Sequence, residues 1–487
     1  MAEGDLTLAD GLSREYLLHH RMCPVERDTD GGLLVAVAPE ALVDGLDDIA
    51  FAYGCCLRTT DVEQEEVERL IERLVTRSDR QIALERVESG EDDFTTDVRG
   101  LANEPPVVRY VNLLVRDAYD ASASDIHLEA KRQGMSVRFR LDGVLTPGPE
   151  PPRGLSQAIV SRVKLLAEMD IAERRRPQDG RIRVRLEERE LDLRVSTVPT
   201  MFGESVVLRL LDRGGRPVEL EELGMRPETL AATSRIAEKP HGMFLVTGPT
   251  GSGKTTTLYG ALLRRNSSAE KIITVEDPIE YQLPGITQMP VHEQAGVTFA
   301  AALRSILRQD PDVIMVGETR DAETAEISVQ AAMTGHLVFS TLHTNDAVSA
   351  VPRLLDLGVP DYLVAATVEA VLAQRLVRRV CESCRTTYKP EPESLAAIAG
   401  RPVGTATLER GAGCSECRDT GYCGRLGIYE LLEITDDLRE AIARGAGKVE
   451  LREIAIDNGM RTLTTDGWHK VESGLTTVEE VLRVVQS

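Results

Sequence analysis

The chain has 487 residues and is strongly acidic, with 57 lysines and arginines against 79 aspartates and glutamates and a formal net charge of −22. At roughly 150 residues per domain, this length predicts about three domains. A hydrophobic fraction of 42% excludes a wholly disordered chain. The acidic balance argues against a protein that coats nucleic acid, because such proteins present a basic surface to the phosphates.

The acidity is concentrated in residues 1–100, which hold 24 acidic residues, ten arginines and no lysine, for a net charge of −14. Two interpretations stay open: a solubilising surface, or a module that docks to a basic partner. We expect such an N-terminal module over residues 1–85 and an acidic linker over 86–104, where large apolar side chains are few. Within the module, residues 33–37 predict a strand and residues 61–76 a helix. The helix prediction rests on apolar residues at helical spacing: Val67, Leu70, Ile71 and Leu74.

No stretch of the sequence reaches the roughly 18 consecutive apolar residues that a membrane-spanning helix needs. The N-terminus, MAEGDLTLAD, is acidic and lacks the basic start and apolar run of a secretory signal. We therefore expect a cytoplasmic protein. Eight cysteines in 487 residues are too few for a disulfide framework.

Residues 105–215 are expected to form an α+β domain. A helix is predicted over 107–121 from the spacing of its apolar residues, and strand patterns follow at 135–141, 181–186, 191–195 and 205–211. Several of these strands alternate apolar and polar residues. The alternation predicts an antiparallel sheet with one face exposed.

Residues 216–487 show a different pattern, in which short apolar runs alternate with helical stretches. The runs lie at 243–247, 271–276, 312–316 and 336–341. This alternation predicts a mainly parallel sheet covered by helices on both faces.

A phosphate-binding motif follows the first of these strands and precedes a predicted helix over 255–265. It reads G-x-x-x-x-G-K-T and comprises Gly248, Pro249, Thr250, Gly251, Ser252, Gly253, Lys254 and Thr255, with Thr256 next in the helix. Glycines let backbone N–H groups converge on phosphates, and the helix N-terminus adds partial positive charge. Lys254 is expected to reach the β and γ phosphates of ATP, and Thr255 to ligate Mg²⁺.

Two acidic groups end neighbouring predicted strands and supply candidates for hydrolysis. Glu318 lies two residues after the strand 312–316 and is our candidate for activating the attacking water. The aspartate that usually precedes such a carboxylate is replaced by Gly317. Glu276, Asp277 and Glu280 are candidates to replace it through bound water.

His336 and His343 flank the next strand. Their spacing of seven places the two imidazoles on opposite faces of a regular strand, which argues against a shared metal. A structural role is the common one for such histidines, whereas a role in sensing the γ-phosphate is the functional alternative.

Two CxxC pairs predict a structural zinc site. Cys381 with Cys384, and Cys414 with Cys417, supply the four thiolates that close a tetrahedral shell. Redox-active pairs are the competing interpretation, and Cys423 is a possible substitute ligand. The pairs lie in an insert at about residues 378–425.

With these features, the chain resembles the secretion ATPases of bacterial type II secretion and type IV pilus systems over roughly residues 100–487. The further motifs that carry the resemblance are Ala123 to His127, Arg138 to Gly143, Arg194 to Pro199, Gly203-Glu204, Arg209, and the histidine box Thr334 to His343.

The resemblance implies a RecA-like P-loop ATPase domain preceded by a PAS-like α+β domain, assembled as a homohexameric ring with ATP between the two domains. It implies Glu318 as the catalytic glutamate, and Arg194 and Arg209 as arginine fingers that approach the phosphates on domain closure. Gly317 is typical of this family, so it is no sign of inactivity.

The short N-terminal region favours type II secretion members, whose module binds the cytoplasmic part of an inner-membrane component. Our hypothesis is a Mg²⁺-dependent ATPase, peripheral on the cytoplasmic face of the inner membrane, that extends a pseudopilus. Its expected partners are the inner-membrane component, bound through residues 1–90, and the inner-membrane platform protein, but no nucleic acid. The alternatives are a type IV pilus assembly ATPase, a nucleic-acid motor, and a nucleotide-gated scaffold that does not hydrolyse ATP.

Overall fold

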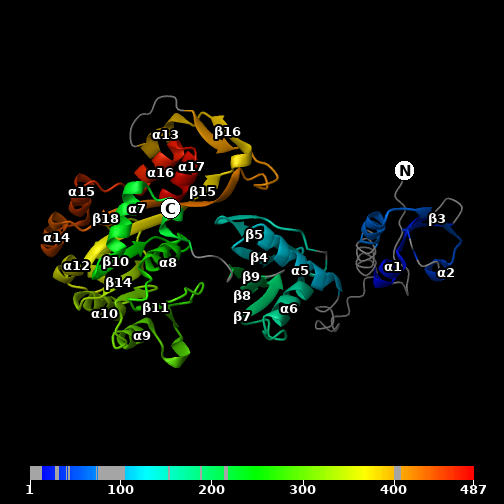
Figure 1. Cartoon of the computed structure of the whole chain (residues 1–487), viewed down its shortest axis with the longest axis horizontal. Helices are drawn as coiled ribbons and strands as arrows, with labels where there is room; N and C mark the ends of the chain where they lie inside the picture. The colour runs from blue at the N-terminus through cyan, green and yellow to red at the C-terminus, as the bar shows by residue number, and fades with distance from the viewer. Residues whose placement is uncertain are drawn as a thin grey trace.

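The structure is a computed structural model that describes residues 14–27, 32–39, 41, 44–72, 74, 105–151, 154–186, 189–212, 218–399 and 407–486. The predicted linker and the boundaries at residues 85, 104 and 215 lie outside these ranges. Figure 1 shows the three sheet regions in chain order along the long axis, from the N-terminal sheet on the right to the largest sheet on the left.

The N-terminal elements form a three-stranded sheet in the order β1-β2-β3. The elements are α1 (Arg14–His20), β1 (Met22–Arg27), β2 (Leu33–Val37), α2 (Asp44–Tyr53) and β3 (Leu57–Asp61). The predicted strand at 33–37 is confirmed as β2. The predicted helix is also found, over residues 64–72, with Val67 and Ile71 buried. It begins later than predicted because Asp61 pairs with Val37 in the parallel β2–β3 ladder.

The α+β region has a six-stranded antiparallel sheet in the order β6-β5-β4-β9-β8-β7. Its elements are α5 (Pro105–Asp120), β4 (Asp125–Ala130), β5 (Met135–Leu141), β6 (Val144–Pro147), α6 (Ser156–Leu166), β7 (Gln178–Leu186), β8 (Arg189–Thr200) and β9 (Gly203–Asp212). Helices α5 and α6 pack their apolar residues with one face of the sheet. The predicted helix, the four predicted strands and the antiparallel arrangement are confirmed, whereas β4 and β6 were not predicted.

The largest sheet has seven strands in the order β12-β11-β13-β14-β10-β15-β18, parallel except for β18. Its first half comprises η1 (Leu220–Leu223), α7 (Pro227–Ala237), β10 (Gly242–Thr247), α8 (Lys254–Arg265), β11 (Ile272–Glu276), β12 (Thr287–Pro290), η2 (Glu293–Ala295), α9 (Phe299–Ile306), β13 (Val313–Val316), α10 (Ala322–Met333) and β14 (Leu337–Leu342). The four predicted strands of this region are confirmed as β10, β11, β13 and β14.

The second half of this region continues the sheet and adds a smaller hairpin. It comprises α11 (Ala350–Asp356), α12 (Asp361–Thr367), β15 (Val368–Val380), η3 (Glu382–Cys384), β16 (Arg385–Tyr388), α13 (Pro392–Ala399), β17 (Leu408–Gly411), β18 (Tyr422–Glu433), α14 (Asp436–Ala443), α15 (Lys448–Asp457), α16 (Leu463–Glu472) and α17 (Val478–Val485). Strands β16 and β17 form a separate antiparallel pair.

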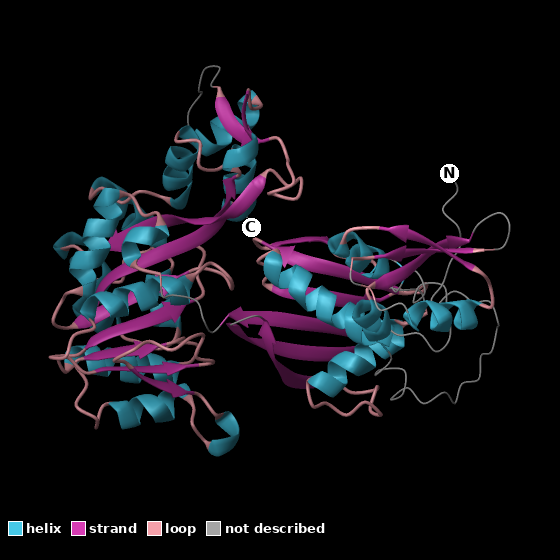
Figure 2. Ribbon diagram, turned by 45° about the vertical axis from the view of Figure 1, so that its right-hand side comes forward, coloured by secondary structure: helices cyan, strands magenta, loops and turns pink. Residues whose placement is uncertain are grey.

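Both faces of the seven-stranded sheet are buried, as predicted. Met243 and Leu245 of β10 belong to one apolar cluster and the alternate residues Phe244 and Val246 to another, because successive side chains of a strand point to opposite faces. Helices α7 and α8 contribute to the second cluster, and α9 to α12 to the first. Figure 2 shows these helices as layers on either side of the strands. The sheet therefore holds the carboxyl ends of its parallel strands at one fixed edge.

Candidate active site

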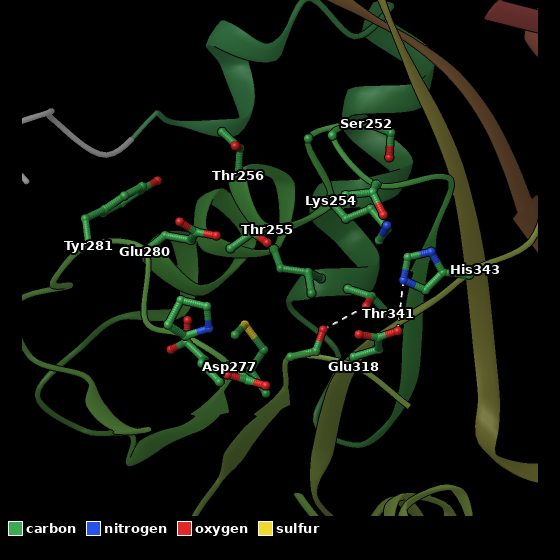
Figure 3. Close-up of a pocket in the computed structure, with 18 of the residues that line it drawn as sticks. Ser252, Lys254, Thr255, Thr256, Asp277, Glu280, Tyr281, Glu318, Thr341 and His343 are labelled. Atoms are coloured by element: carbon green, nitrogen blue, oxygen red, sulfur yellow. Dashed lines mark hydrogen bonds and ion pairs between the residues drawn. The ribbon is translucent and has the colours of Figure 1, made fainter. Parts of the chain in front are cut away.

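A cavity of about 560 Å³ opens at the carboxyl ends of the parallel strands. Its walls include residues 250–256 of the phosphate-binding loop, the ends of β11 and β13, and Leu210 of the α+β region. Figure 3 shows Lys254, Thr255, Glu318 and His343 directed into this space. The structure thus brings the phosphate-binding loop and the candidate catalytic glutamate into one cavity, at the place where parallel α/β sheets bind ligands.

The glycines of the loop are required by its tight course around β15. Gly248, Gly251 and Gly253 all have positive φ, and a Cβ on Gly248 would lie 2.4 Å from the carbonyl oxygen of Gln374. The side chain of Gln374 accepts a 2.7 Å hydrogen bond from Thr257 of α8, which ties the helix to the same strand. The loop is therefore fixed between β10 and β15 with the N-terminus of α8 pointing at the cavity.

Lys254 lies folded back on its own loop. Its Nζ donates hydrogen bonds to the carbonyl oxygens of Gly248 and Pro249, at 2.8 and 3.0 Å. Burial lowers the pKa of Lys254 to about 8, against the opposing attraction of Glu318. A phosphate entering the cavity would offset the cost of burying the charged amine and raise the pKa of Lys254 again, because an anion stabilises the protonated form.

Glu318 follows β13 and is held from two sides. Its carboxylate lies 2.6 Å from Nε of Arg320 and 2.9 Å from Nε2 of His343, and it is 16% exposed. Burial, helped by the nearby Lys254, lowers the pKa of His343. His343 is thus an oriented neutral donor to the carboxylate at neutral pH, and Glu318 retains access to the cavity.

The position before Glu318 has little room for a side chain. A Cβ on Gly317 would lie 3.2 Å from the carbonyl oxygen of Val275 and 3.4 Å from Cα of Glu276. The carbonyl oxygen of Gly317 accepts a 2.7 Å hydrogen bond from Thr341 of β14. The close approach of the backbone at the end of β11 therefore favours glycine at this position.

Glu276, a predicted ligand of the nucleotide or its metal, is already engaged within the protein. It is 2% exposed, and it accepts hydrogen bonds from the hydroxyls of Tyr259 and Thr274 and, at 3.0 Å, from Nε2 of Gln288. Both carboxylate oxygens are thereby occupied. Asp277 and Glu280 also line the cavity. Glu276 therefore suits a supporting role better than the predicted ligand role.

The two predicted arginine fingers are cross-strand neighbours. Arg194 of β8 pairs with Arg209 of β9, and both act electrostatically on Glu280. Neither arginine lines the cavity of the phosphate-binding loop; both line a separate hollow on the six-stranded sheet. Nε of Arg209 donates to Asp125 at 2.8 Å. Burial, reinforced by neighbouring Arg181, lowers the pKa of Arg194. Like charges directly opposite on a sheet are unfavourable, so this pair is suited to an anionic ligand.

His336 lies apart from the cavity, contrary to its prediction as a nucleotide-binding residue. It precedes β14, whereas His343 follows that strand, so the two histidines lie at opposite ends of the strand, about 23 Å apart at about 3.3 Å per residue. Nδ1 of His336 lies 2.9 Å from the carbonyl oxygen of Ala331. Of the two histidines, only His343 lines the cavity.

The lining residues that the sequence analysis missed include Arg320, Tyr281 and Arg425. Arg320 follows Glu318 by two residues, and Tyr281 follows the acidic box directly, so proximity in sequence was an available signal for both. Arg425 comes from β18, more than a hundred residues later, and its position depends on the fold.

The four predicted cysteine ligands converge outside this cavity. Their sulfur atoms all lie within 4.8 Å of one another, with 3.9 Å between Cys381 and Cys414 and 3.8 Å between Cys384 and Cys417. Tetrahedral zinc with Zn–S bonds of about 2.3 Å requires S–S separations of about 3.8 Å. Cys417 also accepts hydrogen bonds from backbone N–H groups of Cys414 and Gly421, both at 3.2 Å. The cluster fits zinc, and the exposed Cys423 is not part of it.

None of the described helices is both long and apolar enough to cross a bilayer.

A family model described as type II/IV secretion system protein matches residues 101–483. The chain belongs to this family. It is 47% identical over 483 residues to type II secretion system protein E of Xanthomonas campestris pv. campestris, covering 98% of this chain and 85% of the relative. It is 44% identical to type II secretion system protein E of Pectobacterium carotovorum subsp. carotovorum, covering 97% and 96%. Type IV pilus assembly ATPase PilB of Myxococcus xanthus is also 44% identical, covering 96% and 85%.

Solved structures of ATPases share the fold of this family member. The pilus retraction motor PilT with bound ADP is 27% identical with a TM-score of 0.52, covering 77% of this chain and 96% of that one. The ATPase DotB of Yersinia pseudotuberculosis is 20% identical with a TM-score of 0.58, covering 78% and 93%. The resemblance drawn from the motifs, the mixed α/β fold with a parallel-sheet ATPase domain, and the assignment to the secretion-type ATPases are confirmed.

Proposed function

We propose that the chain hydrolyses ATP in the cavity described above and that this hydrolysis drives a type II secretion system. The observation that carries the proposal is the shared position of Lys254 and Glu318 in one cavity at the carboxyl edge of a parallel sheet. Lys254 supplies phosphate binding, and Glu318 supplies the carboxylate that hydrolysis requires beyond binding.

ATP binding is assigned to the phosphate-binding loop and the start of α8. Backbone N–H groups of the loop would bind the phosphates. The Lys254 amine would give up its hydrogen bonds to the carbonyl oxygens of Gly248 and Pro249 and bind phosphate oxygens instead. Thr255 is the residue that would hold Mg²⁺, and Asp277 and Glu280, which line the same cavity, would act on it through water. When bound, the metal neutralises charge on the β and γ phosphates.

Glu318 orients the attacking water and accepts its proton. His343 fixes the carboxylate at 2.9 Å, so that its remaining lone pairs face the cavity. Arg194 and Arg209 approach from the α+β region and stabilise charge that develops on the transferred phosphoryl group. Because these arginines come from another part of the chain, their approach links hydrolysis to relative motion of the two regions.

The secretion assignment rests on the relatives named type II secretion system protein E, which align along nearly the whole chain. We infer a homohexameric ring, peripheral on the cytoplasmic face of the inner membrane, that extends a pseudopilus. Residues 1–90 would dock to the cytoplasmic part of an inner-membrane component, and the ring would act on the platform protein. Assembly of type IV pili is the second candidate, favoured by the PilB relative.

Two experiments test these assignments. Lys254→Ala should abolish ATP binding and phosphate release by the full chain, whereas Lys271→Ala, at an exposed lysine of the same region, should change neither. Phosphate release that survives Lys254→Ala would place hydrolysis elsewhere. For the partner, the full chain should co-purify with the cytoplasmic part of the type II inner-membrane component, less strongly as salt rises. Co-purification with pilus components instead would favour the second candidate.

A further inference from the structure

The turn between β5 and β6 presents a carboxylate at a fixed position. Asp142 and Gly143 both have positive φ, 48° and 85°, and the pair Leu141–Val144 closes the hairpin around them. These angles are those of a two-residue type I′ turn, in which Asp-Gly is a preferred sequence. Nη1 of Arg140 donates to the carbonyl oxygen of Gly143 at 2.9 Å and braces the turn.

Asp142 uses its carboxylate outside its own sheet. Oδ2 accepts a 3.0 Å hydrogen bond from the backbone N–H of Gly424, and Oδ1 lies 3.4 Å from Nε of Arg425. The Asp142 side chain is 25% exposed. The turn preference explains an aspartate at this position, but it does not account for two contacts with the start of β18.

A β-bulge at the start of β18 creates the surface that Asp142 contacts. Arg425 pairs with Arg378 and Tyr422 with Val380, so Cys423 and Gly424 together oppose a single residue of β15. Gly424, the second of these two residues, has a φ of 75°, a left-handed conformation that glycine adopts without a steric penalty. The bulge frees the N–H of Gly424 from the strand ladder and redirects the residue that follows.

That following residue, Arg425, lines the cavity of the phosphate-binding loop. Its side chain is 46% exposed. The contact with Asp142 uses Nε, and within the described part of the chain no hydrogen bond engages the two terminal nitrogens. A guanidinium held by Nε has both terminal nitrogens available for a phosphate, the ligand for which arginine has the best geometry.

We propose that Asp142 is a positioning residue that holds Arg425 through Nε and directs its terminal nitrogens at the phosphates of the bound nucleotide. The inference rests on the proposed function of the cavity. Because Asp142 belongs to the α+β region and Arg425 to the seven-stranded sheet, Arg425 is oriented only while these two regions are in contact. The phosphate site therefore senses the position of the α+β region through this pair.

The test is a double-mutant cycle on the full chain, with Asp142→Asn, Arg425→Gln and their combination. The Kd of Mg²⁺·AMP-PNP is measured by fluorescence titration, and thermal unfolding checks each variant. Each single substitution should raise Kd about three- to five-fold, the effect of losing one partly exposed charge pair. In the Arg425→Gln background, Asp142→Asn should have no further effect. Asp120→Asn, at an exposed carboxylate of α5 that pairs with Arg116, is the control and should leave Kd unchanged.

Two results would overturn the inference. If Asp142→Asn raises Kd equally in the unsubstituted chain and in the Arg425→Gln chain, Asp142 acts through the stability of the fold and not through Arg425. An unchanged or lower Kd in Asp142→Asn alone would show that Asp142 does not orient Arg425 for phosphate. Failure of the proposed function is distinguishable from either, because the unsubstituted chain would then not bind AMP-PNP at all.

Discussion

Tyr259 and Tyr281 form a pair in which only one hydroxyl has a hydrogen-bond partner among the described residues. Their rings meet edge to face with centroids 4.7 Å apart. The Tyr259 hydroxyl donates to Glu276, whereas the Tyr281 hydroxyl is buried without such a partner. The two hydroxyls therefore provide a matched test of what supports Glu276.

Tyr259→Phe removes one hydrogen bond from a carboxylate that is 2% exposed. Hydrogen bonds to charged groups contribute about 1.5–3 kcal/mol, and the loss leaves one oxygen of Glu276 without its donor. Thr274 and Gln288 still satisfy the other oxygen. We expect the free energy of unfolding to fall by about 2 kcal/mol, which for a region of this size lowers Tm by about 5 °C.

Urea unfolding followed by the fluorescence of Trp468 measures this change. It is the chain's one tryptophan, and it packs against the core of the seven-stranded sheet, so it reports on the region that contains Glu276. Tyr281→Phe is the control and should lower the free energy of unfolding by less than about 0.5 kcal/mol, because it deletes a hydroxyl without a hydrogen-bond partner among the described residues. Equal losses for the two variants, or no loss for Tyr259→Phe, would refute the hydrogen-bond network as the support of Glu276.

Three further outcomes are expected. Burial sets the pKa of Lys254 at about 8, and bound phosphate favours the protonated amine. ATP affinity should therefore be constant below pH 8 and fall up to about tenfold per pH unit above it. Measuring the Kd of ATP across this range tests the direction of the change, and an affinity that rises with pH would contradict it. Cys384→Ser should lower the zinc content of the purified protein and the exposed Cys423→Ser should not, as metal analysis would measure; equal zinc in both would exclude the four-cysteine site. Arg194→Gln should reduce kcat about 10³-fold with little change in ATP affinity, while the exposed Arg183→Gln should leave kcat unchanged; a loss confined to affinity would assign Arg194 to binding.

Those parts of the site that are encoded locally were predictable from the sequence. The order of glycines, Lys254 and Thr255 specifies a loop and a helix start, and each CxxC pair specifies a turn that holds two sulfurs. Strands such as β10 and β13 were predicted because continuous apolar runs have few alternatives in a parallel sheet. Strand β6 was missed because four residues that include a proline carry too little pattern.

The features that depend on tertiary contacts were not predictable from spacing. Glu276 follows the same acidic pattern as Asp277 and Glu280, but Tyr259 and Gln288 engage its carboxylate from two other elements. The spacing of seven argued against a shared metal for His336 and His343, but it did not show which of the two lies at the carboxyl ends of the parallel strands. Arg425 lines the cavity because a bulge in β18 redirects it, and no local sequence pattern predicts that bulge.

The measurement that tests the central claim most directly is the comparison of ATP binding with phosphate release in Glu318→Gln. The substitution keeps the shape of the side chain and removes the base, so ATP should bind with unchanged Kd while phosphate release falls at least about 100-fold. Glu326→Gln, at an exposed glutamate of α10, should match the unsubstituted chain in both. Phosphate release at the unsubstituted rate in Glu318→Gln would contradict the account, because hydrolysis would then not depend on this carboxylate.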